Sequence, residues 1–138
     1  MAKWINVYHT TGLGNADKII KDGWNIQKQF LRGQLYGRGI YFWEKEDDAK
    51  MFGELYYSKS GYDILMEEVP YRNILSYDFK MRVPNNDDAD LFSKQMIQRG
   101  YELVEIRSAY MDDTTMKQAK GKAYVWLVDI NIPYLKIS

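Results

Sequence analysis

Val7-Tyr8-His9-Thr10-Thr11 is an apolar segment that contains the only histidine of the chain, and together with Tyr36-Gly37-Arg38-Gly39-Ile40-Tyr41-Phe42 it is the most informative part of the sequence. The second segment is a glycine-punctuated turn that leads into an aromatic run. β-Branched and aromatic residues favour strands, and closely spaced glycines mark turns. The two segments therefore predict two strands, with a helix between them.

Outward from these segments, turn residues divide the chain into further strands and helices without a linker or repeat. Acidic residues in the first turn, as in Glu46-Asp47-Asp48, favour a helix. Pro70 separates two extended segments, which could also form one bent strand. The sequence predicts strands at 4–10, 39–43, 62–69, 71–77, 101–106 and 121–131, helices between Asn15 and Gly23, from Glu46 to about Tyr57 and from the cap at 85–88 to Gly100, and loops at 25–38 and 107–120. This is a single α+β domain over residues 1–138.

Composition limits the class of protein. The 138 residues are 46% hydrophobic, which is enough for one core, and the formal net charge of zero gives no field that would attract nucleic acid. Absence of cysteine excludes a disulfide framework and thiolate metal sites, and it fits a reducing compartment. The start of the chain is too polar for a signal peptide, and no apolar run approaches the length of a membrane span. We expect a cytoplasmic protein without a membrane partner.

The order of Tyr8-His9-Thr10-Thr11, the helix that ends near Gly23, and Tyr36 to Phe42 resembles the His-Tyr-Glu branch of ADP-ribosyltransferases, which contains poly(ADP-ribose) polymerases and diphtheria toxin. Ala49 matches an alanine of the following family helix, and Tyr124 to Ile130 is similar to the closing strand. The resemblance implies a compact ADP-ribosyltransferase-type fold, in which two small, mostly antiparallel sheets are packed at an angle with flanking helices and an NAD cleft between them.

The resemblance also implies roles in NAD binding. His9 would hydrogen-bond a hydroxyl of the adenosine ribose, while the backbone of Thr10, followed by Thr11, would hold the nicotinamide amide. Tyr41 would stack on the nicotinamide ring, with Phe52 as the opposing ring. Each residue also has a structural interpretation, because a lone strand-end histidine is often a structural hydrogen-bonding group and an apolar helix residue usually faces the core.

Two departures from the family pattern concern catalysis. The family has a glutamate at the beginning of the closing strand, which stabilises the developing positive charge. In this sequence the corresponding position falls near Lys122, Ala123 or Tyr124, none of which is acidic. Asp112 and Asp113 are the candidate catalytic replacements, although Asp112 to Thr115 also fits a solvated turn. Two further candidates, Glu102 and Glu105, lie at odd strand spacing, so at most one can face the cleft. Thr10 replaces the usual glycine and adds a branched side chain near the nicotinamide.

Two functions follow as expectations. The first is a mono-ADP-ribosyltransferase that moves ADP-ribose from NAD to a protein target, as a phage or toxin-like effector does in a host cell. The second is an inactive relative that binds NAD or ADP-ribose, or that inhibits a protein by occupying its surface. Lys117, Lys120 and Lys122 with Tyr110 and Tyr124 form basic-aromatic material for single-stranded nucleic acid, but a solvated loop or a contact to an acidic partner explains them as well. No ligand spacing for a metal is present in the sequence.

Overall fold

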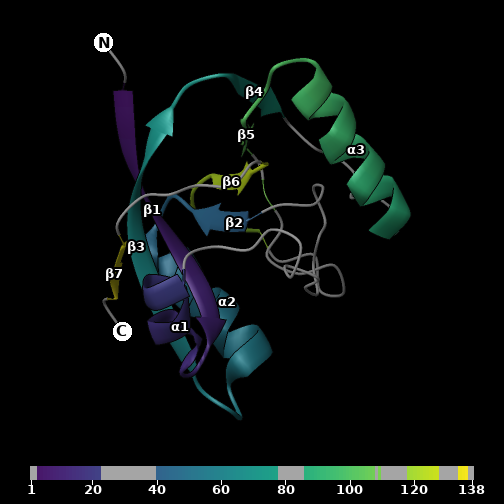
Figure 1. The fold of residues 1–138 in the computed structure, drawn as a ribbon. Coiled ribbons are helices and arrows are strands. Elements are labelled where there is room, and N and C mark those ends of the chain that lie inside the picture. Colours follow the sequence, from purple (N-terminus) through teal and green to yellow (C-terminus); the bar gives the residue numbers. More distant parts are fainter. Residues whose placement is uncertain are drawn as a thin grey trace.

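The computed structural model describes residues 3–22, 40–77, 86–107, 109, 118–127 and 134–136. Within these residues the chain alternates between helices and strands in an α+β arrangement (Figure 1). The strands are β1 (Lys3–Gly12), β2 (Ile40–Trp43), β3 (Tyr62–Tyr71), β4 (Ile74–Tyr77), β5 (Leu103–Ile106), β6 (Ala123–Trp126) and β7 (Tyr134–Lys136), and the helices are α1 (Asn15–Asp22), α2 (Glu46–Tyr57) and α3 (Asn86–Gln98). Gly23, the loop at 25–38 and most of the loop at 107–120 lie outside the described residues.

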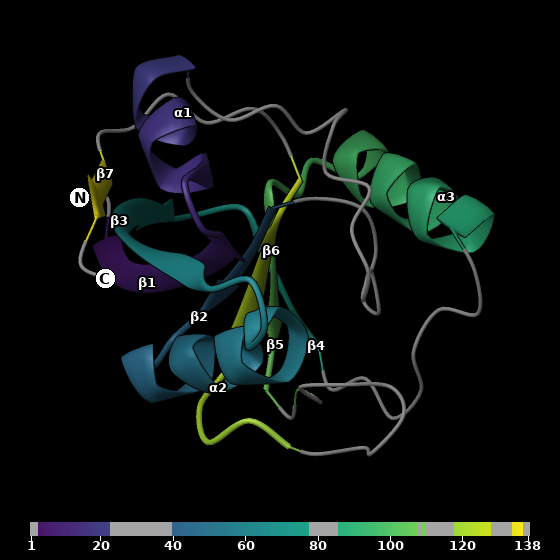
Figure 2. The ribbon, with the colours of Figure 1, turned by 90° about the horizontal axis from the view of Figure 1, so that it is seen from below.

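The strands hydrogen-bond into one mixed sheet, whereas the sequence predicted two sheets. The order is β4-β5-β6-β2-β1-β3-β7, and among the described pairs only β4 and β5 are parallel. β1 and β2 share a single residue pair, Tyr8 with Trp43, so the sheet consists of two halves joined at one point. Figure 2 shows β1 and β3 turned across the direction of β2 and β6. The prediction of two separate sheets is therefore wrong in connectivity, because one strand pair joins the halves.

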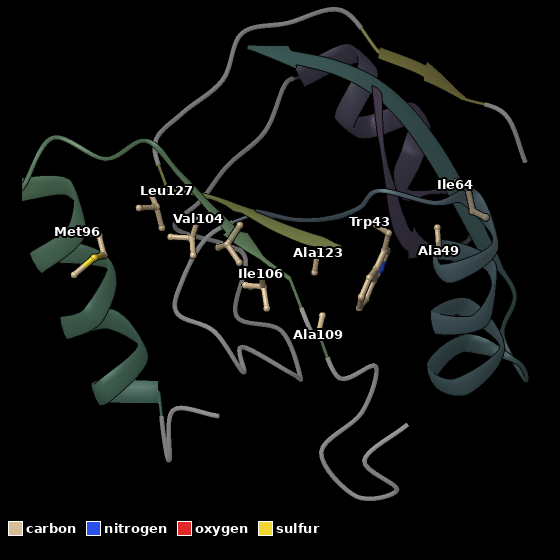
Figure 3. Packing of buried hydrophobic residues seen from close by; sticks show 10 residues of the cluster. Trp43, Ala49, Ile64, Met96, Val104, Ile106, Ala109, Ala123 and Leu127 are labelled. Atoms are coloured by element: carbon tan, nitrogen blue, oxygen red, sulfur yellow. The ribbon is translucent and has the colours of Figure 1, made fainter. Parts of the chain in front are cut away.

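Each face of the sheet carries its own hydrophobic cluster. The first contains Ala49 of α2 and Met96 of α3, and Figure 3 shows it running from Met96 past Val104 and Ala123 to Trp43. The second contains Ala16 of α1 with Val7, Ile40, Phe42, Leu65, Val69, Leu103, Tyr124 and Trp126. Figure 2 shows α1 and α2 on opposite sides of β1 and β3. Alternate residues of β2 and β6 thus face different helices.

β3 continues through Pro70, which the sequence analysis placed between two extended segments. Pro70 pairs with Trp4 of β1, and β7 pairs only with Leu65 to Glu67. A proline is tolerated in a strand where one edge carries no ladder bond, and the described part of β3 has such an edge beyond β7. The chain turns three residues after Pro70, at Asn73, whose φ is 51°. Asparagine adopts this left-handed conformation more readily than most residues.

The predicted helices are confirmed. α2 has the predicted bounds, Glu46–Tyr57, and begins with three acidic residues. Gly53 lets this helix approach β3, because a Cβ there would come within 2.6 Å of the ring of Tyr62. α3 ends as predicted before Gly100, which has a φ of 90°. That conformation favours glycine after the end of a helix.

The closing strand is shorter than predicted. β6 spans Ala123–Trp126 instead of 121–131, and residues 128–133 lie outside the described part. The three-residue strand β7 follows and pairs with β3 at the edge of the sheet. The sequence did not predict this strand, because three residues are too few to show an alternation of apolar and polar side chains.

Candidate functional site

His9 brings the two diagnostic segments together. Its Nδ1 lies 2.6 Å from the main-chain carbonyl oxygen of Tyr41. A carbonyl can only accept, so Nδ1 carries the proton in this contact. The ring is buried and packs edge-on against Phe42, with 5.7 Å between the ring centroids. Burial lowers the pKa of His9 to about 4, against a smaller opposing effect of the hydrogen bond to Tyr41, so the imidazole is neutral near pH 7.

Thr10 and Thr11 are both buried at the end of β1. The Thr10 hydroxyl donates a hydrogen bond of 2.6 Å to the main-chain carbonyl of Ala49 in α2. The branched side chain expected to crowd the nicotinamide is therefore directed at α2. β1 has its one pair with β2 at Tyr8, so the strand end at residues 9–12 extends beyond the described β1–β2 pairing.

Tyr41 and Phe52 contact the same hydrophobic cluster. Both side chains are half-buried and pack against the residues around Trp43 and Ala49. The Phe52 ring lies 5.8 Å from Trp43, 4.6 Å from Tyr56 and 6.4 Å from Tyr57, measured between centroids. His9 meets the backbone of Tyr41 and the ring of Phe42, which packs in the other cluster. The structure thus brings the predicted site residues His9, Thr10, Tyr41 and Phe52 to neighbouring elements. It does not place the rings of His9 and Tyr41 against the same hydrophobic cluster.

Asp112 and Asp113, the candidate catalytic carboxylates, lie outside the described residues. The base of their loop is described: the amide of Ala119 donates to the carbonyl of Ala109 at 3.0 Å. Ala109 is fully buried in the first cluster, and Ala119 packs against it. This pair fixes where the loop leaves the hydrophobic core and where it returns.

The start of β6 carries no acid on the face of Tyr41. Tyr41 pairs with Val125 and Trp43 pairs with Ala123, and both β6 residues belong to the first cluster. Tyr124 belongs to the second cluster, where burial, followed by the negative charges of Glu105 and Glu44, raises its pKa.

Glu105 is buried, and its carboxylate is hydrogen-bonded within the protein. It accepts hydrogen bonds from Tyr71 at 2.7 Å and Ser76 at 3.0 Å, and the ammonium of Lys122 lies 3.6 Å away. Although burial alone would raise its pKa, these hydrogen bonds and the Lys122 charge hold the pKa of Glu105 below the usual value. The same hydrogen bond raises the pKa of Tyr71 to about 12.

Glu102 has a similar structural role. Its carboxylate accepts hydrogen bonds from Arg72 and Asn73, at the corner between β3 and β4. Neither of the two β5-region glutamates is therefore placed as a replacement for the family carboxylate.

Sequence reasoning missed the two carboxylates next to the start of β6. Asp48 is fully buried and accepts hydrogen bonds from the amides of Lys120 and Gly121 at 2.9 and 2.8 Å. Glu44 accepts from the amide of Lys122 at 3.1 Å. The only sequence signal for Asp48 was the acidic first turn of the helix, which was attributed to the helix dipole, and Glu44 precedes that turn.

The described lysines of the proposed basic patch are paired with acids. Lys120 lies 3.9 Å from Asp47, and Lys122 faces Glu105. Lys117 and Tyr110 lie outside the described residues. In the part of the chain that is described, no group of three or more histidine or acidic side chains is arranged to hold a metal ion, and no helix has the length and hydropathy of a membrane span.

Comparison with known proteins adds no relative: no family model and no curated protein sequence matches this chain.

Proposed function

We propose that this chain is a mono-ADP-ribosyltransferase that uses NAD as the donor and modifies a protein target. The observation that carries the proposal is the contact between His9 Nδ1 and the Tyr41 carbonyl. It joins, across 32 residues, the two segments on which the resemblance to ADP-ribosyltransferases rests.

The two-part sheet supports the ADP-ribosyltransferase-type fold as part of this proposal. β1 and β2 diverge after the pair of Tyr8 with Trp43. The end of β1 then has β3 on one side and α2 close to its Thr10 hydroxyl. A cleft between two half-sheets needs such a divergence, because a continuous ladder would close it.

The residues at this divergence have the chemistry that NAD cleavage requires. A neutral histidine can accept a hydrogen bond from a ribose hydroxyl, and main-chain N–H and C=O groups can hold a carboxamide. Tyr41 and Phe52 supply aromatic faces from β2 and α2 for the nicotinamide ring. The bond between C1′ of the ribose and the nicotinamide nitrogen breaks, and neutral nicotinamide leaves with the bonding electrons. A nucleophilic side chain of the target forms the new bond to C1′ and loses its proton to solvent.

The positive charge that develops on the ribose requires an anion nearby. We assign this role to Asp112 or Asp113, since the described acids near β6 are engaged: Glu105 by Tyr71 and Ser76, and Asp48 by main-chain amides.

One observation favours a second function, an inactive relative that binds NAD or ADP-ribose, or that covers a protein surface. The β6 positions on the face of Tyr41 are Ala123 and Val125, both buried and apolar. Loss of one charge-stabilising group costs about 3 kcal/mol of transition-state stabilisation, which is about a hundredfold in rate.

Nicotinamide release distinguishes the two functions. The purified chain is incubated with NAD in a bacterial lysate, free nicotinamide is quantified, and proteins carrying added ADP-ribose are found by mass spectrometry. We expect release and a labelled protein, both reduced at least tenfold in Asp112→Asn or Asp113→Asn. NAD binding without release or label would support the inactive relative instead.

A further inference from the structure

Two consecutive residues in the first turn of α2 hold two separate strands. Asp48 accepts the amides of Lys120 and Gly121, which lead into β6. The carbonyl of Ala49 accepts the hydroxyl of Thr10, at the end of β1. A single turn of one helix therefore sets the position of the β6 entrance relative to the strand end that would hold nicotinamide.

Glu44, two residues before α2, also holds the segment that leads into β6. Its amide donates to the carbonyl of Lys122 at 2.9 Å, and its carboxylate accepts the Lys122 amide. Three consecutive amides, those of Lys120, Gly121 and Lys122, thus point at two carboxylates. We call this arrangement the α2–β6 contact.

The α2–β6 contact is tightly packed. Asp48 has no exposed surface, and both of its oxygens accept a main-chain amide. Hydrogen bonds to an ionised acceptor are about twice as strong as those between neutral groups. A Cβ on Gly121 would lie 2.7 Å from Glu44 Oε1 and 2.9 Å from Lys45 Cγ, so a larger residue here would force the Glu44 and Lys45 side chains to shift.

The segment held by Asp48 continues directly into the proposed site. Ala123 pairs with Trp43 and Val125 with Tyr41, so a displacement of the β6 entrance acts on the strand of Tyr41. Phe52 lies one turn after Asp48 on the same helix. Rate in such a site is sensitive to small displacements, since about 1 Å can cost a hundredfold.

We propose that Asp48 is a positioning residue of the NAD site, which fixes the β6 entrance against α2 and thereby sets the geometry between the two half-sheets. This inference rests on the proposed function. Asp48 contacts no substrate in it, because both carboxylate oxygens are bonded to main-chain amides.

The test compares Asp48→Asn with Asp47→Asn in the full chain. Asparagine keeps the volume of Asp48 but turns an N–H group toward one of the two amides, so one hydrogen bond is lost. Asp47 is the matched control, because it is exposed on the same turn and its one described contact is Lys120 at 3.9 Å. Amide exchange of residues 118–122 is followed by NMR, and nicotinamide release is measured over a range of NAD concentrations.

For Asp48→Asn we expect at least tenfold faster exchange at Lys120 or Gly121 and a tenfold or larger fall in kcat, with the KM for NAD within threefold of wild type. Asp47→Asn should match wild type in amide exchange, kcat and the KM for NAD. Loss of amide protection with kcat within twofold of wild type would overturn the inference, because Asp48 would then serve the fold alone.

Gly121→Ala tests the same contact from the β6 side if Asp48→Asn does not fold, and the same changes are expected. Failure of both variants to fold would also overturn the positioning role. Absence of NAD binding and nicotinamide release in the wild type would contradict the proposed function itself, and the wild-type measurement alone decides that.

Discussion

The hydroxyl of Thr10 donates a hydrogen bond of 2.6 Å to the main-chain carbonyl of Ala49, 39 residues away, in a buried environment. Threonine stands here where the family pattern suggested by the sequence has glycine, and this hydrogen bond is a structural use of the Thr10 side chain. The Thr10 side chain therefore holds α2 against the end of β1.

Removal of this hydroxyl should destabilise the fold. In Thr10→Val the shape is kept, but a buried hydrogen bond to Ala49 is lost, which costs about 1–2 kcal/mol. Thr10→Ser, which keeps the hydroxyl, is the control and should lie closer to wild type. Urea unfolding at pH 7 measures both, and equal stability of the valine variant and wild type would contradict the role given to the bond.

The single histidine allows a direct test of its environment. His9 has its pKa lowered from 6.5 to about 4, mainly by burial, so the unfolded chain binds a proton that the folded chain excludes between these values. Stability is therefore fully present above pH 6.5 and lost as pH falls toward 4, by up to about 3 kcal/mol. The one imidazole Hε1 signal in the NMR spectrum should not titrate until below pH 5. A midpoint near 6.5 would show that the ring is exposed.

Glu105 should make a second contribution to the pH dependence of folding stability, at a lower pH than the unfolded pKa of His9. Its folded pKa is lowered from 4.5, with burial opposed by Tyr71, Ser76 and Lys122, so its stabilisation is present above pH 4.5 and lost as pH falls through the lower folded value. Glu105→Gln should cost about 1–2 kcal/mol at pH 7 and progressively less below pH 4.5. Unfolding curves from pH 7 to 3 measure this difference, with exposed Glu68→Gln as control. A difference that stays constant with pH would contradict the assignment.

At Gly53, helix propensity and packing predict opposite effects of an alanine substitution on stability. Alanine in a helix interior is favoured over glycine by about 1 kcal/mol, so propensity alone predicts that Gly53→Ala stabilises α2. A Cβ there would lie 2.6 Å from the Tyr62 ring, and we expect this overlap to win with a net loss of at least 1 kcal/mol. Denaturant unfolding gives the sign, and a more stable variant would show that Tyr62 moves aside freely.

The sequence predicted those elements whose signals are local. The acids of Glu46-Asp47-Asp48 begin α2, and Gly100 follows α3, because both are effects of the helix ends themselves. The joining of the two half-sheets through Tyr8 and Trp43 depends on where two distant strands meet, so no local pattern encodes it.

In the candidate site, too, some residues could be predicted from the sequence and others could not. The segments around His9 and Tyr41 were identified from their residue types and order, and the structure joins them through the hydrogen bond from His9 Nδ1 to the Tyr41 carbonyl, whereas their roles in NAD binding stay predictions. The role of Asp48 was missed because its partners are main-chain amides 72 and 73 residues away, and a backbone amide leaves no signature in the sequence.

Calorimetric titration of NAD into the wild type, Tyr41→Ala and Tyr41→Phe tests the proposed NAD site. We expect the wild type to bind one NAD, Tyr41→Phe to keep the aromatic face and bind NAD within threefold of wild type, and Tyr41→Ala to bind NAD at least tenfold more weakly. Absence of NAD binding by the folded wild-type chain, or equal affinity of all three proteins, would contradict the assignment of an NAD site that uses the aromatic face of Tyr41.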